Sequence, residues 1–181
     1  MAYLLRTLLL LMLSAICITV CSAFGWVELS FHHIELAIPS FLLVIFIQAF
    51  VMFYFIGISR LVTNVWNALH SEANLNELFE QPPEDLGPYI KKTRQFVHQS
   101  TVCKRQTIPW TMLMLILGMI GFLLGGAHDT GMVSKIIHSG VIYGFISAML
   151  IGLVRQWYYL GKSHKLLREL KGLYQMPDEA M

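Results

Sequence analysis

Charged residues are scarce in this sequence, and their scarcity excludes most kinds of soluble domain. Only 13% of the 181 residues are Asp, Glu, Lys or Arg, whereas 56% are hydrophobic. A soluble globular domain carries about 25% charged residues. The mean hydropathy is +0.60. The composition therefore predicts an integral membrane protein, and the length suits a single domain over residues 1–181.

The sequence also lacks the motifs of soluble enzymes and of nucleic-acid-binding proteins. It contains no glycine-rich phosphate loop, no GxSxG, no HExxH and no CxxC. The net charge is only +2, and the acidic and basic residues are mixed. We therefore expect no nucleic-acid partner and no independent soluble active site.

Cysteine is rare, which argues against a disulfide framework. Cys17 and Cys21 are four residues apart, and Cys103 lies far from both. Adjacent turns of one helix hold their side chains badly for a disulfide. We expect all three to be small apolar packing residues.

Long hydrophobic runs are what the sequence does contain. Each of four runs approaches or exceeds the length of about 20 residues that a helix needs to cross a bilayer. Only Arg6 and Arg155, near run ends, interrupt them with charge. Continuous runs predict helices rather than the alternating strands of a barrel. We predict an all-α integral membrane protein whose first run is a true span and not a signal peptide, with transmembrane helices at about 3–24, 36–58, 108–126 and 137–159.

The basic residues predict the orientation. Apart from Lys135, all of them lie at the start of the first span, in the loop 60–107 or at and beyond the end of the last span. Lysine and arginine concentrate on the cytoplasmic side of membrane proteins. We therefore expect cytoplasmic termini, a cytoplasmic loop 60–107, a cytoplasmic tail 160–181, and a multi-pass location in the cytoplasmic (inner) membrane of a bacterium.

The helices are expected to continue beyond the membrane. The segment 60–78 has apolar residues every three or four positions, which predicts an amphipathic continuation as far as Gln81-Pro82-Pro83. The segments 89–106 and 162–175 continue the third and fourth runs in the same way. The chain thus predicts two tandem helical hairpins, possibly an internal repeat, with helical cytoplasmic extensions.

Small residues recur every four positions in the last run, at Gly140, Gly144, Ala148 and Gly152. Small side chains let two helices approach closely in lipid. We expect this stripe to pack against the third run, which carries Gly118, Gly121, Gly125 and Gly126. Self-association, docking of other membrane subunits, and contact with a flat cofactor are alternative uses of the stripe.

Histidines and carboxylates gather on the side predicted to face outward. His33 and His138 each open a transmembrane run, and two neutral imidazoles from different helices are the ligands of a b-type haem. The order of a histidine-headed helix, a basic loop and a second histidine-headed helix loosely resembles small membrane b-type cytochromes. The sequence therefore predicts an electron-transfer module in which His33 and His138 bind haem b, and Gly140 and Gly144 leave room for it. Six aromatic residues could wall the pocket: Phe41, Phe46, Phe53, Tyr54, Tyr143 and Phe145.

Two alternatives stay open for the same residues. Imidazole and carboxylate ligands suit copper, zinc or iron, so the cluster could bind a metal ion. It could equally anchor the chain in the headgroup layer of a structural or accessory subunit without a cofactor. Gln48, inside the second run, is expected to hydrogen-bond across helices to Ser, Thr or backbone. The candidate metal ligands are His32, His33, Glu35, His128, Asp129 and His138.

Overall fold

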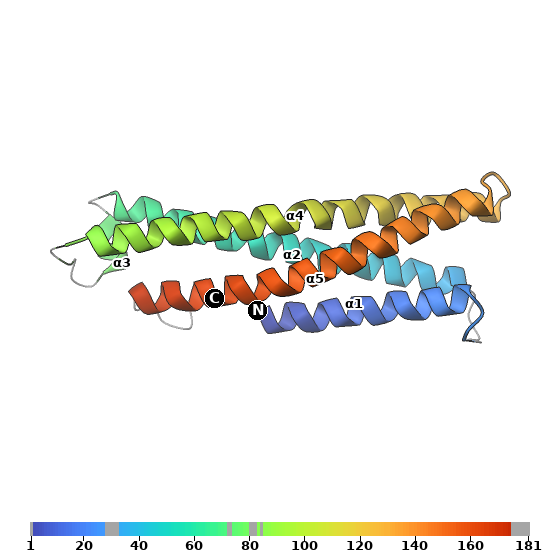
Figure 1. The fold of residues 1–181 in the computed structure, drawn as a ribbon, viewed down its shortest axis with the longest axis horizontal. Coiled ribbons are helices and arrows are strands. Elements are labelled where there is room, and N and C mark those ends of the chain that lie inside the picture. Colours follow the sequence, from blue (N-terminus) through green and yellow to red (C-terminus); the bar gives the residue numbers. More distant parts are fainter. Residues whose placement is uncertain (1, 28–32, 72–73, 80–82, 84, 175–181) are drawn as a thin grey trace.

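The fold is a long helical rod. The computed structural model describes residues 2–27, 33–71, 74–79, 83 and 85–174, and its regular structure there is entirely helical. Four long helices lie side by side along the rod, and α3 is a short turn at one end (Figure 1). The elements are α1 (Ala2–Ala23), α2 (His33–Leu69), α3 (Leu75–Leu78), α4 (Gly87–Asp129) and α5 (Lys135–Tyr174).

The long helices form two antiparallel hairpins, α1 with α2 and α4 with α5 (Figure 1). Both hairpins turn at the same end, which we call the turn end. There Gly25 and Gly131 have φ angles of 69° and 77°, a left-handed conformation that favours glycine after a helix. α4 packs against both α2 and α5, and so joins the two hairpins.

Four helices are long and apolar enough to cross a membrane, as the sequence predicts. At 1.5 Å per residue, α4 and α5 are each about 60 Å long, roughly twice the hydrocarbon thickness of a bilayer. α1 is much shorter and begins about halfway along the rod (Figure 1). Beyond that level only α2, α4 and α5 continue, and we call this three-helix part the extension.

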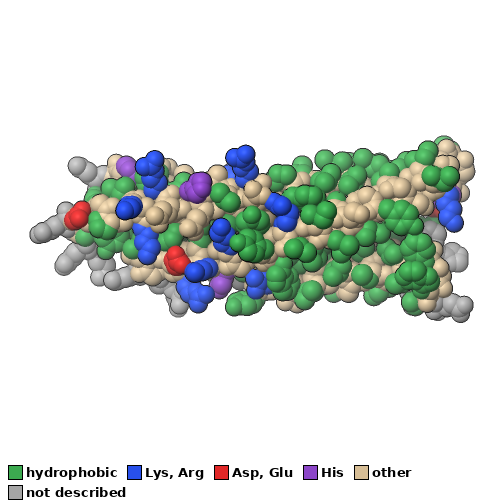
Figure 2. Space-filling view, viewed as in Figure 1, with side chains coloured by type: hydrophobic (Ala, Val, Ile, Leu, Met, Phe, Trp, Pro, Cys, Tyr) green, Lys and Arg blue, Asp and Glu red, His purple; other side chains and the backbone are tan. Residues whose placement is uncertain are grey.

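The surface changes character at the same level. Hydrophobic side chains cover the half of the rod that includes the turn end, and most Lys, Arg and His side chains lie on the extension (Figure 2). The exposed hydrophobic residues of the first half include Phe46, Phe53 and Tyr143, which are 62%, 67% and 55% exposed. Such a surface fits contact with lipid rather than with water.

Each half of the rod has its own apolar core. In the four-helix half, Leu9, Met12, Ile47 and Met114 are completely buried. In the extension, α2, α4 and α5 bury a second cluster around Phe96. The predicted helical continuation past the apolar runs of α2, α4 and α5 is therefore confirmed. Its core members are Ile58, Val62, Val65, Leu69, Phe96, Leu166, Leu167, Leu170 and Tyr174.

The end predicted for the second helix is wrong. α2 ends at Leu69 and not at residues 81–83. The positions that would prolong its buried face are Glu72, Ala73 and Asn76, which offer little apolar surface to bury. Without that burial, helix propensity alone does not hold a further turn. The backbone N–H of His70 instead closes a turn on the carbonyl of Asn67, at 3.1 Å.

The small-residue stripe of α5 does not form a single packed face. Gly152 and Ala148 are buried, and a Cβ at Gly152 would lie 2.8 Å from Met114 Cε of α4. Gly140 and Gly144 are exposed, and a Cβ at either would meet nothing within 4 Å. A step of four residues overshoots a helical turn by about 40°. Over three steps the stripe therefore rotates by about 120°, from the outer surface into the α4 interface.

Replacing Gly152 by leucine is therefore expected to destabilise the bundle by about 1–3 kcal/mol, because Met114 is fully buried and has little room to move. Thermal unfolding in detergent would measure the change. Gly144→Leu is the matched control, since its surroundings within the chain are open. Equal losses of stability in the two variants would contradict this packing.

Candidate functional site

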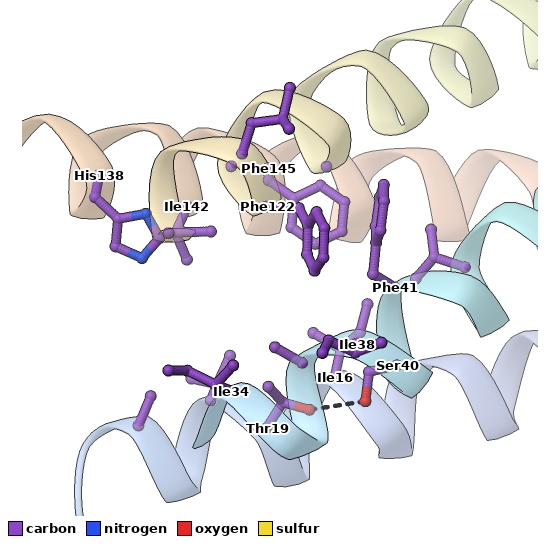
Figure 3. A pocket seen from close by; sticks show the side chains of 18 of the residues that line it. Ile16, Thr19, Ile34, Ile38, Ser40, Phe41, Phe122, His138, Ile142 and Phe145 are labelled. Atoms are coloured by element: carbon purple, nitrogen blue, oxygen red, sulfur yellow. Dashed lines mark hydrogen bonds between the residues drawn. The ribbon is translucent and has the colours of Figure 1, made fainter. Parts of the chain in front are cut away.

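A cavity lies among the four long helices near the turn end. Its volume is about 350 Å³, within the range of about 300–1,000 Å³ that ligand pockets occupy. His138 and Ile142 of α5 lie on the opposite side of the cavity from Thr19 of α1 and Ile34 of α2 (Figure 3). Because all four helices contribute, any ligand here would contact both hairpins.

Glycines of α4 make the room on one side of the cavity. Gly118, Gly121, Gly125 and Gly126 all line it. A Cβ at Gly118 would lie 3.1 Å from ring atoms of both Phe41 and Phe145, and one at Gly121 would lie 2.9 Å from Ile142 Cδ1. Side chains at these positions would therefore press on the residues that form the other walls.

Aromatic rings form another wall. Phe41 of α2 and Phe122 of α4 stack with their ring centroids 5.0 Å apart and their planes 15° apart. Both line the cavity together with Phe145 of α5 (Figure 3). Two of the six predicted wall residues, Phe41 and Phe145, thus lie where a pocket wall requires them. Of the other four, Phe46, Phe53 and Tyr143 are exposed on the outside, and Tyr54 does not line the cavity.

Polar groups in the lining are few. Thr19 and Ser40 share a hydrogen bond of 2.8 Å between their hydroxyl oxygens, which ties α1 to α2. Asp129 and His138 lie at the turn end of the lining. Gly125 leaves space beside His138, since a Cβ there would lie 3.3 Å from His138 Cε1. An apolar pocket with a few polar groups is typical of a small-molecule site.

Of the residues predicted to hold haem, His138 lines the cavity and the two glycines of α5 do not. Gly140 and Gly144 lie on the outer surface of α5, so these two glycines do not fit the role of making room for a cofactor. The glycines of α4 occupy that position instead. His33 is the first residue of α2, and its side chain falls outside the described part of the chain. Ala37, one helical turn later, lines the cavity.

The predicted metal ligands do not form a cluster among the residues that can be placed. Within the described part of the chain, no three His, Cys, Asp or Glu side chains come together where they could hold a metal ion. His128 and His138 stack, with centroids 5.8 Å apart and planes 12° apart. Glu35 and Asp129 are exposed, and His32 lies outside the described residues.

A buried polar network lies nearer the extension, and sequence analysis found only part of it. Gln156 Nε2 donates to Gln48 Oε1 at 2.7 Å and to Thr111 Oγ1 at 2.8 Å. All three side chains are completely buried. The predicted bond from Gln48 to another helix is confirmed, although its partner is a glutamine rather than Ser, Thr or backbone. Gln156 could have been recognised because it follows buried Gly152 by four residues.

Cys103 is buried at the edge of the four-helix core, in the same cluster as Leu5 of α1, and Cys17 and Cys21 are more accessible; all three are free thiols. Burial raises the pKa of the Cys103 thiol, because the thiolate would lose its hydration, and Lys162 offsets this only in part. A thiol of raised pKa is a poor nucleophile at neutral pH. The structure therefore agrees with a packing role for Cys103.

Comparisons of this chain with protein families, with curated proteins and with solved structures found no match. The cavity and its lining are therefore the basis for assigning a function.

Proposed function

We propose that the chain is a membrane-embedded electron-transfer module that binds haem b in the cavity near the turn end. The observation that carries the proposal is the position of His138 in a cavity walled by glycines and phenylalanines from other helices. In this proposal the protein spans the cytoplasmic membrane of a bacterium. The turn end faces outward, and the extension and both termini are cytoplasmic.

The residues have distinct roles in this proposal. His138 would supply one imidazole ligand, and His33, at the start of α2, would supply the other. Phe41, Phe122 and Phe145 contact the ring and exclude water, which favours a single stable ligand geometry. A bound haem accepts and gives up one electron. The cavity volume of about 350 Å³ is small for a haem, so a bound haem would be only partly enclosed.

Visible spectra of the detergent-purified protein, oxidised and then reduced with dithionite, test the proposal. We expect a Soret band and sharp reduced α and β bands, and we expect His138→Ala and His33→Ala to abolish them. His98→Ala is the matched control, because His98 is an exposed histidine of the extension. A flat spectrum from protein expressed with sufficient haem would refute the proposal. Unchanged bands in His138→Ala would refute the assigned ligand.

A structural or accessory role is the second candidate, and one observation favours it. Gly140 and Gly144 leave an open strip on the outer surface of α5, between exposed Ile137 and Ile151. Small residues in such a strip allow close approach of another transmembrane helix. Under this alternative, Gly144→Leu would lower the mass of the purified assembly while leaving the thermal stability of the single chain unchanged. A metal-binding role has no comparable support among the described residues.

A further inference from the structure

Two arginines lie near the level at which α1 begins, where the rod changes from an apolar to a basic surface. Arg6 of α1 stacks over the ring of Trp157 of α5, 5.0 Å from its centroid. Arg155 of α5 lies 5.6 Å from the ring centroid of Trp110 of α4. Because α1, α4 and α5 are linked by these contacts, the four side chains share one level of the rod. We call them the arginine–tryptophan collar.

The collar lies where the headgroup layer of a bilayer would be. The length of α5 between its start at Lys135 and Trp157 is about 33 Å. The length of α4 between Trp110 and its end at Asp129 is about 29 Å. Both lengths match a hydrocarbon core of about 30 Å. Tryptophan is enriched at the membrane–water interface, so the Trp rings mark the same boundary.

Arg6 is held in place by the protein but lacks an anion. Its Nη2 would lie 2.6 Å from a Cβ at position 161, so in this conformation the guanidinium occupies the space that Gly161 leaves. Nη2 makes one long hydrogen bond, 3.4 Å to the carbonyl of Trp157, and the buried Nε atom has no hydrogen-bond partner. Among the described residues, no carboxylate pairs with Arg6.

Arg155 is similarly oriented by neutral groups. Its Nε donates to the carbonyl of Gln106 at 3.2 Å, and Nη2 contacts the side-chain oxygen of the same residue. It too has no carboxylate partner in the part of the chain that the structure describes. Lys104, Arg105 and Lys162 lie within two helical turns and add positive charge. Within the described ranges, the collar is thus a basic surface with no internal counter-ion.

We propose that the arginine–tryptophan collar binds the phosphate groups of anionic phospholipids. Guanidinium groups bind phosphate through paired hydrogen bonds, and the headgroup layer supplies that phosphate at the level of the collar. More distant basic residues of the extension do not reach it, since Arg94 lies about 24 Å along α4 from Trp110. The inference rests on the proposed membrane insertion but not on haem.

The test uses the full-length protein, delipidated in a neutral detergent. Phosphatidylglycerol, phosphatidylcholine and inorganic phosphate are titrated separately, and binding is measured by native mass spectrometry and by the shift in unfolding temperature. We expect saturable binding of phosphatidylglycerol alone. Arg6→Gln and Arg155→Gln should each weaken it about fivefold, Arg94→Gln should not, and Arg6→Lys should retain part of the affinity.

Three results would overturn the proposal. Equal binding of phosphatidylcholine would show that no anionic site exists. Equal stabilisation by inorganic phosphate would indicate a soluble-anion site instead of a lipid site. The same loss in Arg94→Gln as in Arg6→Gln would indicate diffuse attraction by the whole extension. Circular dichroism and size exclusion check that each variant folds, and carbonate extraction of cell membranes tests insertion separately.

Discussion

Replacing Phe96 by alanine is expected to lower the free energy of unfolding of the extension by about 3–5 kcal/mol. Phe96 is only 2% exposed and is the residue of α4 that is buried in the second apolar core. It packs in the cluster formed by residues of α2 and α5, including Val62 and Leu170. Its removal would leave a cavity between the three long helices of the extension.

Limited digestion with trypsin measures this effect, because the extension carries exposed basic residues such as Lys91 and Arg94. Cleavage of Phe96→Ala should be much faster than cleavage of the unmodified protein. Phe53→Ala is the matched control, since Phe53 is 67% exposed on the apolar half of the rod. Equal protection of Phe96→Ala and Phe53→Ala would show that the extension does not depend on this core.

Replacing Gln156 by methionine is expected to cost about 1–3 kcal/mol. Methionine has a similar length and fills the same space, so packing should change little. The amide of Gln48 would then lose its best hydrogen bond while remaining buried, with only the sulfur of Met12 3.3 Å from its Nε2. Thr111 would lose its amide donor as well. An unpaired amide in so apolar a core is unfavourable.

The double variant Gln48→Met with Gln156→Met separates the hydrogen bond from the cost of an unpaired amide. If pairing matters, the double variant should be more stable than the sum of the two single changes predicts. Unfolding in detergent is monitored by the loss of the helical circular dichroism signal. It gives the free energies of unfolding of the unmodified protein, the two single variants and the double variant. Strict additivity would mean that the two glutamines do not interact energetically.

Most of the architecture follows from the sequence, because it depends on patterns local to each helix. Runs of about 20 apolar residues predict four spans, and those spans correspond to α1, α2, α4 and α5. The three- and four-residue spacing of apolar residues beyond the spans predicts the extension. Even the cross-helix bond of Gln48 was predictable, since an amide in an apolar run must find a partner.

Only the tertiary structure shows which way each residue of a helix faces. Gly140 and Gly152 belong to one sequence stripe, but the accumulated rotation of the helix places the first on the surface and the second against α4. The end of α2 at Leu69 depended on how much apolar surface the neighbouring helices leave to cover. Neither result can be derived from spacing alone.

For the candidate sites too, the sequence pointed to individual residues and the tertiary structure decided which of them meet. The sequence singled out His138 by its place at the start of an apolar run, but it did not predict the cavity, whose walls come from four helices. It also contained Arg6 and Trp157, but these residues are 151 positions apart and meet only in the folded rod. Local hydrophobic patterns determined which segments form long apolar helices. The packing of those helices alone decided which side chains meet, because contacts between distant segments depend on helix rotation and register.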